Sequence, residues 1–282
     1  MTEMRASSLS RLSTEQFHHL TALVFTHSGI NLPESKKVML ESRLNKRLRA
    51  LKMESFKDYI ELLSKGTDTT NELIHMIDVV TTNKTDFFRE PHHFTYLENN
   101  ILPELAQTKR DVRIWSAACS SGEEPYTLAM ILENFASQQN GFHYDILASD
   151  ISTTMLEKGA LAIYMADKVE CIPQETKKRY LLKSRDLEKP TVRIAPLLRS
   201  KVKFERINLM DAVLPVDGIF DIVFCRNVLI YFDRKTQLEV VKKLTAHLAV
   251  GGYLFIGHSE SLHQAELPLT QEKPTVYKKI LA

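Results

Sequence analysis

The chain has 282 residues, 44 % of them apolar, which suits one large or two moderate folded domains rather than a disordered protein. Its 37 basic and 35 acidic residues nearly balance, so the molecule as a whole is not a polyanion binder. Three cysteines without a C-x-x-C pair exclude a disulfide framework and a tetrahedral thiolate site. The apolar runs are too short to span a bilayer and the N-terminus lacks the apolar core of a secretory signal, so we expect a cytoplasmic protein without direct membrane insertion.

Residues 12–80 are predicted to form helices. The stretch "LSTEQFHHLTALVFTHSGI" starts with Ser13 or Thr14 as a helix cap and stops at Gly29. Two further helices are expected at about 54–64 and 69–80. These helices predict a small N-terminal helical domain.

The helix predicted within residues 35–53, after the first helix and before the other two, is amphipathic and basic. Four leucines recur at helical spacing and define its apolar stripe: Leu40, Leu44, Leu48 and Leu51. Between residues 36 and 57 the chain has eight basic and two acidic side chains. Two readings remain open for the basic face: a solvated outer surface, or a docking surface for an acidic partner.

From residue 112 onward, short apolar runs alternate with amphipathic helices. Five runs are predicted strands: 112–117, 144–149, 201–206, 220–225 and 252–257. Such alternation indicates a parallel sheet covered on both faces, with ligands at the carboxyl ends of its strands. The charged stretch 173–200 interrupts this rhythm and is interpreted as an insertion or subdomain.

The loop after the first strand, "SAACSSGEEPYTLAM" (116–130), stands where nucleotide-binding proteins place a glycine-rich turn, yet it contains only Gly122. No G-x-G-x-x-G or P-loop motif occurs in the chain. The adjacent Glu123 and Glu124 would repel phosphates but suit a cation, and S-adenosylmethionine combines a sulfonium, an ammonium and a ribose diol. Asp150, at the end of the second strand, can accept hydrogen bonds from both ribose hydroxyls; its alternative role is a helix N-cap.

Six motifs in order resemble the chemotaxis receptor glutamate O-methyltransferases, the CheR-type family. They are "TTNKTDFFREPHHF" (81–94), "WSAACSSGEEPYTLAM" (115–130), "ASDIS" (148–152), "INLMD" (207–211), "FDIVFCRNVLIYFD" (220–233) and "GGYLFIGHSES" (251–261). The resemblance implies an all-α N-terminal domain (1–85). It is followed by an α/β, Rossmann-like class I S-adenosylmethionine-dependent methyltransferase domain (86–282) with a small antiparallel β-subdomain at about 173–203.

The resemblance also implies roles for individual residues. Arg89 and Tyr231 are the expected catalytic residues, with Arg89 also close to the cofactor. The other expected cofactor-binding residues are Asn83, Thr85, Glu123, Asp150, Asn208, Leu209, Arg226 and Asn227. The alternatives are a salt bridge for Arg89, loop capping for Asn208 and Asn227, and an ordinary amphipathic position for Tyr231.

The implied reaction is transfer of a methyl group from S-adenosylmethionine to receptor glutamates, leaving S-adenosylhomocysteine. A glutamate side chain is ionised at neutral pH, so the reaction requires neither a general base nor a metal. Neighbouring side chains on a helix do not converge, so His92 and His93 are not expected to form a metal pair, and His258 is expected to be structural.

The expected partners are the cytoplasmic methylation helices of chemoreceptors, which display acidic and amide side chains. The expected docking residues on the basic helix are Arg43, Lys46, Arg47 and Arg49. The stretch "KSRDLEKPTVRI" (183–194) lacks the glycine of family members that tether to a receptor C-terminal peptide, which argues against tethering. An RNA methyltransferase is disfavoured by the near-neutral charge, and a non-catalytic cofactor sensor by the presence of Arg89, Asp150 and Tyr231.

Overall fold

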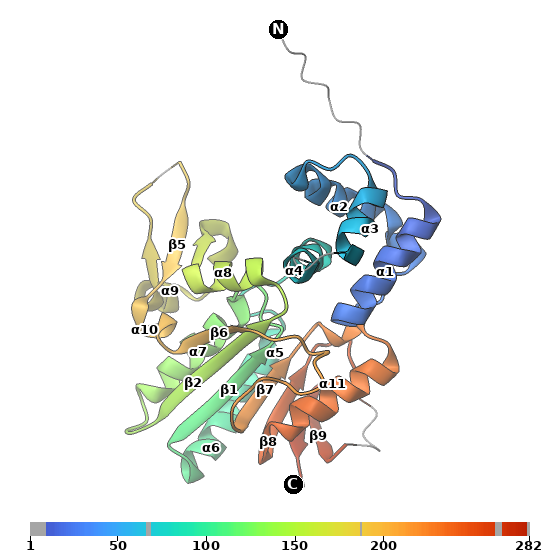
Figure 1. Ribbon diagram of the computed structural model, residues 1–282. Coiled ribbons are helices and arrows are strands. Elements are labelled where there is room, and N and C mark those ends of the chain that lie inside the picture. Colours follow the sequence, from blue (N-terminus) through green and yellow to red (C-terminus); the bar gives the residue numbers. More distant parts are fainter. Residues whose placement is uncertain (1–9, 66–68, 187, 263–266, 281–282) are drawn as a thin grey trace. The chain divides into compact units, whose positions relative to one another are not determined.

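The computed structural model describes residues 10–65, 69–186, 188–262 and 267–280. The chain divides into two compact units, Met1–Thr82 and Asn83–Ala282 (Figure 1). Among the described residues, no helix combines the length and the apolar character needed to span a membrane. The three cysteines are unpaired thiols, buried at Cys119 and Cys225 and exposed at Cys171.

The first unit is built from helices alone within its described part. These are α1 (Thr14–Ser28), the 3-10 turn η1 (Glu34–Lys36), α2 (Lys37–Leu51), α3 (Phe56–Lys65) and α4 (Thr69–Val80). Ser13 caps α1 through the backbone N–H of Gln16, and the Gln16 side chain accepts from the Ser13 N–H in return. The helix ends at Gly29, whose φ of 71° suits glycine. The predicted cap and end of this helix are confirmed.

The apolar stripe of α2 forms part of the core of this unit. Leu40 and Leu44 are fully buried and Leu48 is 2 % exposed, packed with Phe17 and Leu20 of α1. The opposite face of α2 is open, with Val38 78 % exposed. Burying one face of each helix in a shared core stabilises helices of 10–15 residues, which are marginal alone.

The second unit contains a seven-stranded sheet in the order β6-β2-β1-β7-β8-β10-β9. The first five strands in this order run parallel, and β10 pairs antiparallel with both β8 and β9. The strands are β1 (Asp111–Ala117), β2 (His143–Asp150), β6 (Val202–Arg206), β7 (Phe220–Cys225), β8 (Leu248–Ile256), β9 (Leu269–Lys273) and β10 (Val276–Lys279). The order reverses between β1 and β7, and ligands of open parallel sheets bind at such a switch point.

Both faces of this sheet are covered. Along β1, Val112 and Ile114 belong to one apolar cluster, whereas Trp115 and Ala117 belong to the other. Because successive strand residues point to opposite faces, this division means that the sheet separates two cores. The covering helices are α5 (Pro91–Tyr96), the π-helical η2 (Leu97–Ile101), α6 (Leu102–Thr108), α7 (Glu123–Ala136), α8 (Thr153–Leu161) and α11 (Arg234–Ala246) (Figure 1).

A second, antiparallel sheet has the strand order β3-β5-β4. Its elements are β3 (Ile163–Met165), η3 (Ala166–Val169), α9 (Gln174–Tyr180), β4 (Leu181–Lys183), β5 (Thr191–Ile194) and α10 (Pro196–Arg199). The small antiparallel subdomain expected from the sequence is present, and its first strand precedes the expected range of about 173–203. Leu187, within the stretch considered for tethering, lies outside the described residues.

Candidate active site

The parallel strands bring the expected cofactor residues to one edge of the sheet. Asp150 is the last residue of β2, Asn208 follows β6, and Arg226 follows β7 directly. Glu123 starts α7, six positions after Ala117, the last residue of β1. Carboxyl ends of parallel strands meet at the same edge, so side chains separated by up to about a hundred positions share one site.

The loop after β1 bends without the usual glycines. Ala118, Ser120 and Gly122 all have positive φ angles, 75°, 49° and 95°. Only at Gly122 would a Cβ atom clash, because it would lie 2.9 Å from the Tyr164 hydroxyl and 3.0 Å from the Gly159 Cα atom. Left-handed backbone at non-glycine residues is strained and concentrates at functional sites. One glycine therefore suffices in this turn.

Asp150 holds this loop through hydrogen bonds. Its Oδ2 accepts from the backbone N–H of Ser120 at 2.8 Å, and its Oδ1 accepts from the N–H of Ser152 at 2.9 Å. The alternative that Asp150 caps the following helix is wrong, because Ser152 is the N-cap of α8 and accepts from the N–H of Met155. Both carboxylate oxygens of Asp150 thus hold backbone N–H groups at the carboxyl end of β2.

The two adjacent glutamates of the loop have different partners. Glu123 is 4 % exposed and accepts a hydrogen bond from the Ser121 hydroxyl at 2.7 Å. Burial raises the pKa of Glu123 above its ordinary value, and the Ser121 bond offsets this only in part. Glu124 accepts from the Ser116 hydroxyl at 2.7 Å and from Nη1 of Arg226 at 3.0 Å. Within the described residues, Glu124 is therefore paired with an arginine and Glu123 is not.

Arg226 is buried in a network of carboxylates that the sequence did not suggest. Its guanidinium donates to Glu124, to Oε2 of Glu90 at 3.0 Å and to the carbonyl oxygen of Arg89. Asn227 donates through Nδ2 to Oε1 of Glu90 at 3.0 Å. Burial opposes ionisation of Glu90, but the Asn227 and Arg226 hydrogen bonds outweigh it and lower the pKa to about 2. Glu90 stays ionised and joins the 83–90 segment to the end of β7.

Arg89 is not paired with Glu90, contrary to the salt-bridge alternative. Its side chain donates to the carbonyl oxygen of Lys84 at 2.9 Å, and within the described residues it forms no ion pair. Its neighbours Phe88 and Glu90 have positive φ angles of 53° and 57°, so the backbone turns sharply on either side of it. The guanidinium charge of Arg89 is therefore available to a carboxylate that enters the site.

Asn83 and Thr85 lie in the same segment. The carbonyl oxygen of Asn83 accepts from the Ser120 hydroxyl at 3.1 Å, which attaches the start of the segment to the loop after β1. Thr85 is half-buried. This hydrogen bond places the 83–89 segment beside the turn that contains Gly122.

Glu260 fixes the loop that leads to Tyr231. This carboxylate is 8 % exposed and accepts from the backbone N–H groups of Asn227 at 3.1 Å, of Ile230 at 3.3 Å and of Gly257. Asn227 has a φ of 58°, and Tyr231 ends the 3-10 turn η4 (Leu229–Tyr231) half-buried. The motif "GHSES" contains this acid. The sequence alone could not show that the carboxylate accepts hydrogen bonds from backbone N–H groups 30 or more positions away.

Asn208 and Leu209 form a tight turn after β6. Oδ1 of Asn208 accepts from the N–H of Met210 at 3.0 Å, which is the loop-capping bond expected as its alternative role. Leu209 is 7 % exposed, and its carbonyl oxygen accepts from the Lys243 ammonium. The N–H of Ile207 donates to the carbonyl oxygen of Asp150 at 3.1 Å, so this turn lies beside the end of β2.

Comparison with known proteins identifies the fold and its chemistry. Residues 15–81 match the family model described as the CheR methyltransferase all-alpha domain, and residues 83–278 match the CheR methyltransferase SAM binding domain. The chain belongs to the CheR methyltransferase family. A chemotaxis protein methyltransferase of Borreliella burgdorferi is 39 % identical over 95 % of both chains. One of Escherichia coli strain K12 is 36 % identical over 94 % of this chain and 91 % of its own.

Membership in the CheR family confirms the predicted fold class, an all-α domain followed by an S-adenosylmethionine-dependent class I methyltransferase domain. It also confirms that the chain is a methyltransferase. The residue roles inferred above stay predictions.

The basic side chains of α2 in this CheR-family chain fall into two groups, those bonded within the helical unit and those that are exposed. Arg43 donates to the carbonyl oxygens of Val80 and Thr81, the latter at 2.7 Å, and so caps the end of α4. Arg47 binds the buried carboxylate of Glu72 with two nitrogens. In contrast, Lys46 and Arg49 are exposed. Of the four expected docking residues, only these two are exposed and form no side-chain bond to the described part of the helical unit.

Three histidines of this CheR-family chain cluster beside Glu90. The rings of His92 and His93 lie 4.3 Å apart between centroids, and that of His258 lies 4.1 Å from His92. The expectation that the adjacent His92 and His93 would not converge is wrong, because their rings are in contact and the His258 ring packs against both.

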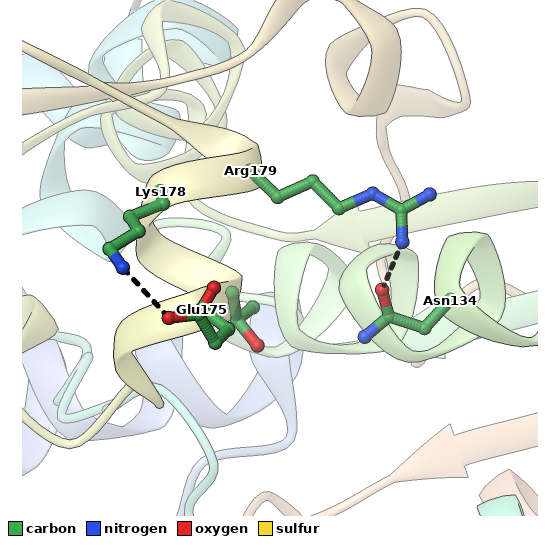
Figure 2. Close-up of a pocket in the computed structure, with 5 residues that line it drawn as sticks. Asn134, Glu175, Lys178 and Arg179 are labelled. Carbon is green, nitrogen blue, oxygen red and sulfur yellow. Dashed lines mark hydrogen bonds and ion pairs between the residues drawn. The ribbon is translucent and has the colours of Figure 1, made fainter.

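A surface groove of about 340 Å³ lies elsewhere in this domain, between the last turns of α7 and helix α9. Figure 2 shows its side chains bonded to one another: Lys178 pairs with Glu175 at 2.8 Å, and Arg179 donates to Asn134 at 3.1 Å. Asn134 is near the opposite end of α7 from Glu123. This groove is not part of the strand-end site.

Proposed function

We propose that this chain transfers the methyl group of S-adenosylmethionine to side-chain carboxylates of glutamates in methyl-accepting chemotaxis receptors. The products are glutamate methyl esters and S-adenosylhomocysteine, in the cytoplasm, for sensory adaptation. The observation that carries the proposal is the loop after β1, where Asp150 holds a single-glycine turn and the buried Glu123 begins the helix. The relatives named above, chemotaxis protein methyltransferases, support the acceptor.

The residues at the strand ends fit S-adenosylmethionine. Glu123 offers an ionised carboxylate to its cationic end, and Asp150 offers acceptors to the ribose diol. Asn208 and Leu209 supply an amide and an apolar side chain for the adenine. Asn83, Thr85, Arg89, Arg226 and Asn227 complete the binding site in this proposal. When bound, the cofactor supplies a methyl group that its positively charged sulfur makes electrophilic.

The protein's contribution to the reaction is mainly positioning. The acceptor glutamate is ionised at neutral pH, since its ordinary pKa is about 4.3, and therefore needs no base. Arg89, which forms no ion pair within the described residues, would orient this carboxylate, and the Tyr231 hydroxyl would direct one oxygen toward the methyl group. Holding two reacting groups in line can supply roughly 7–11 kcal/mol of the barrier.

The charge arrangement favours orientation over neutralisation. Arg226 is already compensated by Glu90 and Glu124, so it does not compete for the acceptor. Attack of an anion on a cation diminishes both charges, and a site less polar than water favours that change. A single uncompensated arginine, Arg89, can orient the acceptor without strongly reducing its nucleophilicity.

Recognition of the receptor is assigned to α2. Lys46 and Arg49 offer exposed positive charge to receptor helices that display acidic side chains, and complementary charge speeds association. Arg43 and Arg47 support this surface by holding α2 to α4. We propose neither nucleic-acid binding nor a tether to a receptor C-terminal peptide.

The test is transfer of radiolabelled methyl groups from S-adenosylmethionine to chemoreceptor-containing membranes, followed by mild alkali and capture of volatile methanol. Alkali-labile label on the receptor is the expected result, and Arg89→Ala should reduce it. Parallel reactions contain RNA or no acceptor. Label on RNA, or cofactor binding without label on any receptor, would overturn the proposed acceptor.

A further inference from the structure

His92, His93 and His258 offer three imidazole nitrogens at one place. One nitrogen can be taken from each ring such that the three nitrogens all lie within 4.8 Å of one another. Nε2 of His258 is 3.2 Å from Nδ1 of His92 and closer still to its Nε2. His92 and His258 are exposed, whereas His93 is fully buried. The cluster is therefore anchored on one rigid ring and open to solvent on the side of the other two.

The buried ring has a lone pair without a donor. Nε2 of His93 lies 2.7 Å from the Thr275 hydroxyl, which donates its own hydrogen to the carbonyl oxygen of Pro274. The hydroxyl must therefore accept from His93, which assigns the proton to Nε2 and leaves a lone pair on Nδ1. Nδ1 is buried and accepts no hydrogen bond from the described residues. Oε2 of Glu90, which lies 3.5 Å from Nδ1, is another acceptor.

The surrounding charges do not oppose a cation at the three rings. Neutral imidazole is the form that binds metal ions. Arg226 would repel a dication, but its charge is compensated by Glu90 and Glu124.

We propose that His92, His93 and His258 bind a divalent transition-metal ion of the Zn²⁺ class. Imidazole nitrogens bind Zn²⁺ at about 2.0–2.1 Å, which places donors of a tetrahedral site about 3.4 Å apart. The exposed rings of His92 and His258 can close the remaining distance by side-chain rotation. Three histidine ligands leave one position for water, as in other sites with three protein ligands. Glu90, 3.5 Å from Nδ1 of His93 and hydrogen-bonded to the His258 backbone, would position this set.

The consequence of binding is a bridge between two segments that flank the strand-end site. His92 and His93 begin α5, just after Arg89 and Glu90, and His258 follows β8 near Glu260. An ion shared by these residues would hold the backbone of the Arg89 segment against the loop held by Glu260. Methyl transfer needs no Lewis acid, so the ion is assigned a positioning role.

The experiment measures Zn²⁺ binding to the full-length protein after removal of metals with a chelator. Competition against a chromogenic chelator gives affinity and stoichiometry, and Co²⁺ absorption reports four-coordinate geometry. We expect one tight site per chain in the wild type. The double variant His92→Ala/His258→Ala should bind at least about 100-fold more weakly, because loss of outer-shell partners alone costs 10–100-fold.

The matched control is His19→Ala/His143→Ala, which removes two exposed histidines outside the cluster. It should retain the site, and circular dichroism should show that both double variants are folded. Absence of a tight site in the wild type would overturn the proposal. So would equal Zn²⁺ affinity in the two double variants. Neither result depends on methyl transfer, so the proposed function is tested separately.

Discussion

Arg226 and Glu90, 136 positions apart in the chain, form a buried ion pair at 3.0 Å between the end of β7 and the segment before α5. The side chains are 2 % and 11 % exposed. Breaking a buried pair by removing one partner strands the other charge, which costs about 3–5 kcal/mol. The pair is thus a condition for the local fold as well as for the position of Arg89.

Substitution Glu90→Gln keeps the shape of the side chain but removes its charge. Among the described residues Arg226 then retains only Glu124 as an ionic partner, so we expect the free energy of unfolding to fall by about 2–3 kcal/mol. Trp115, the single tryptophan, is fully buried in β1 and reports unfolding of this domain by fluorescence. Glu98→Gln, an exposed position in η2, is the control. Equal denaturation midpoints in the two variants would contradict the argument.

Asp150→Asn tests the acid at the end of β2. An amide retains one acceptor oxygen and loses the charge, so it can neither hold both backbone N–H groups nor accept strongly from a ribose diol. Hydrogen bonds to charged groups contribute about 1.5–3 kcal/mol, which predicts roughly 10- to 100-fold weaker binding of S-adenosylhomocysteine. Calorimetry measures it, with Asp145→Asn, exposed on the same strand, as control. Unchanged affinity would remove Asp150 from the cofactor site.

The pH dependence of cofactor affinity tests Glu123. Burial raises the pKa of this carboxyl above its ordinary value, so it becomes protonated at a higher pH than an exposed glutamate does. Only the ionised form attracts the cationic end of the cofactor. Affinity should therefore be full above this raised pKa and be lost as the pH falls through it.

The measurement is S-adenosylhomocysteine binding across the mildly acidic range in wild type and Glu123→Gln. The glutamine variant cannot ionise at this position, so its affinity should be lower and nearly constant with pH. A glutamine variant with the same pH profile as the wild type would show that another group causes the dependence.

The sequence predicted what depends on local pattern. Alternation of strands and helices places Asp150, Asn208 and Arg226 at the same edge, because strand ends can be located from apolar runs. The single glycine was also informative, since Gly122 is where a Cβ atom would clash with Gly159 and Tyr164.

What the sequence did not predict depends on partners distant in the chain. Glu90 contacts residues 136 and 137 positions away, and no local pattern marks an acid as the partner of a particular arginine. The left-handed backbone at Ala118 and Ser120 was hidden for a different reason, because neither residue type signals that conformation. On α2, periodicity separates the apolar from the polar face. It cannot show which basic side chains form hydrogen bonds to the neighbouring part of the helical unit.

The division of cations on α2 changes how receptor docking should be tested. Reversal of Arg47 would strand the buried carboxylate of Glu72, which also accepts from the Tyr59 hydroxyl at 2.9 Å. Arg47→Glu should therefore destabilise the helical unit by about 3–5 kcal/mol. Circular dichroism should detect this loss, and reduced methylation by that variant would not identify a docking residue.

Reversal of the exposed pair, Lys46→Glu/Arg49→Glu, isolates docking from folding. Neither side chain is buried, so thermal unfolding and cofactor affinity should match the wild type, whereas kcat/KM for receptor methylation should fall about tenfold at low salt. The deficit should shrink as salt is raised, because exposed charges are screened within about 8–10 Å at physiological ionic strength. Arg11→Glu/Lys57→Glu makes the same change in net charge at two exposed positions outside α2. If this control loses as much activity as the α2 variant, attraction is set by overall charge and the docking role of Lys46 and Arg49 fails.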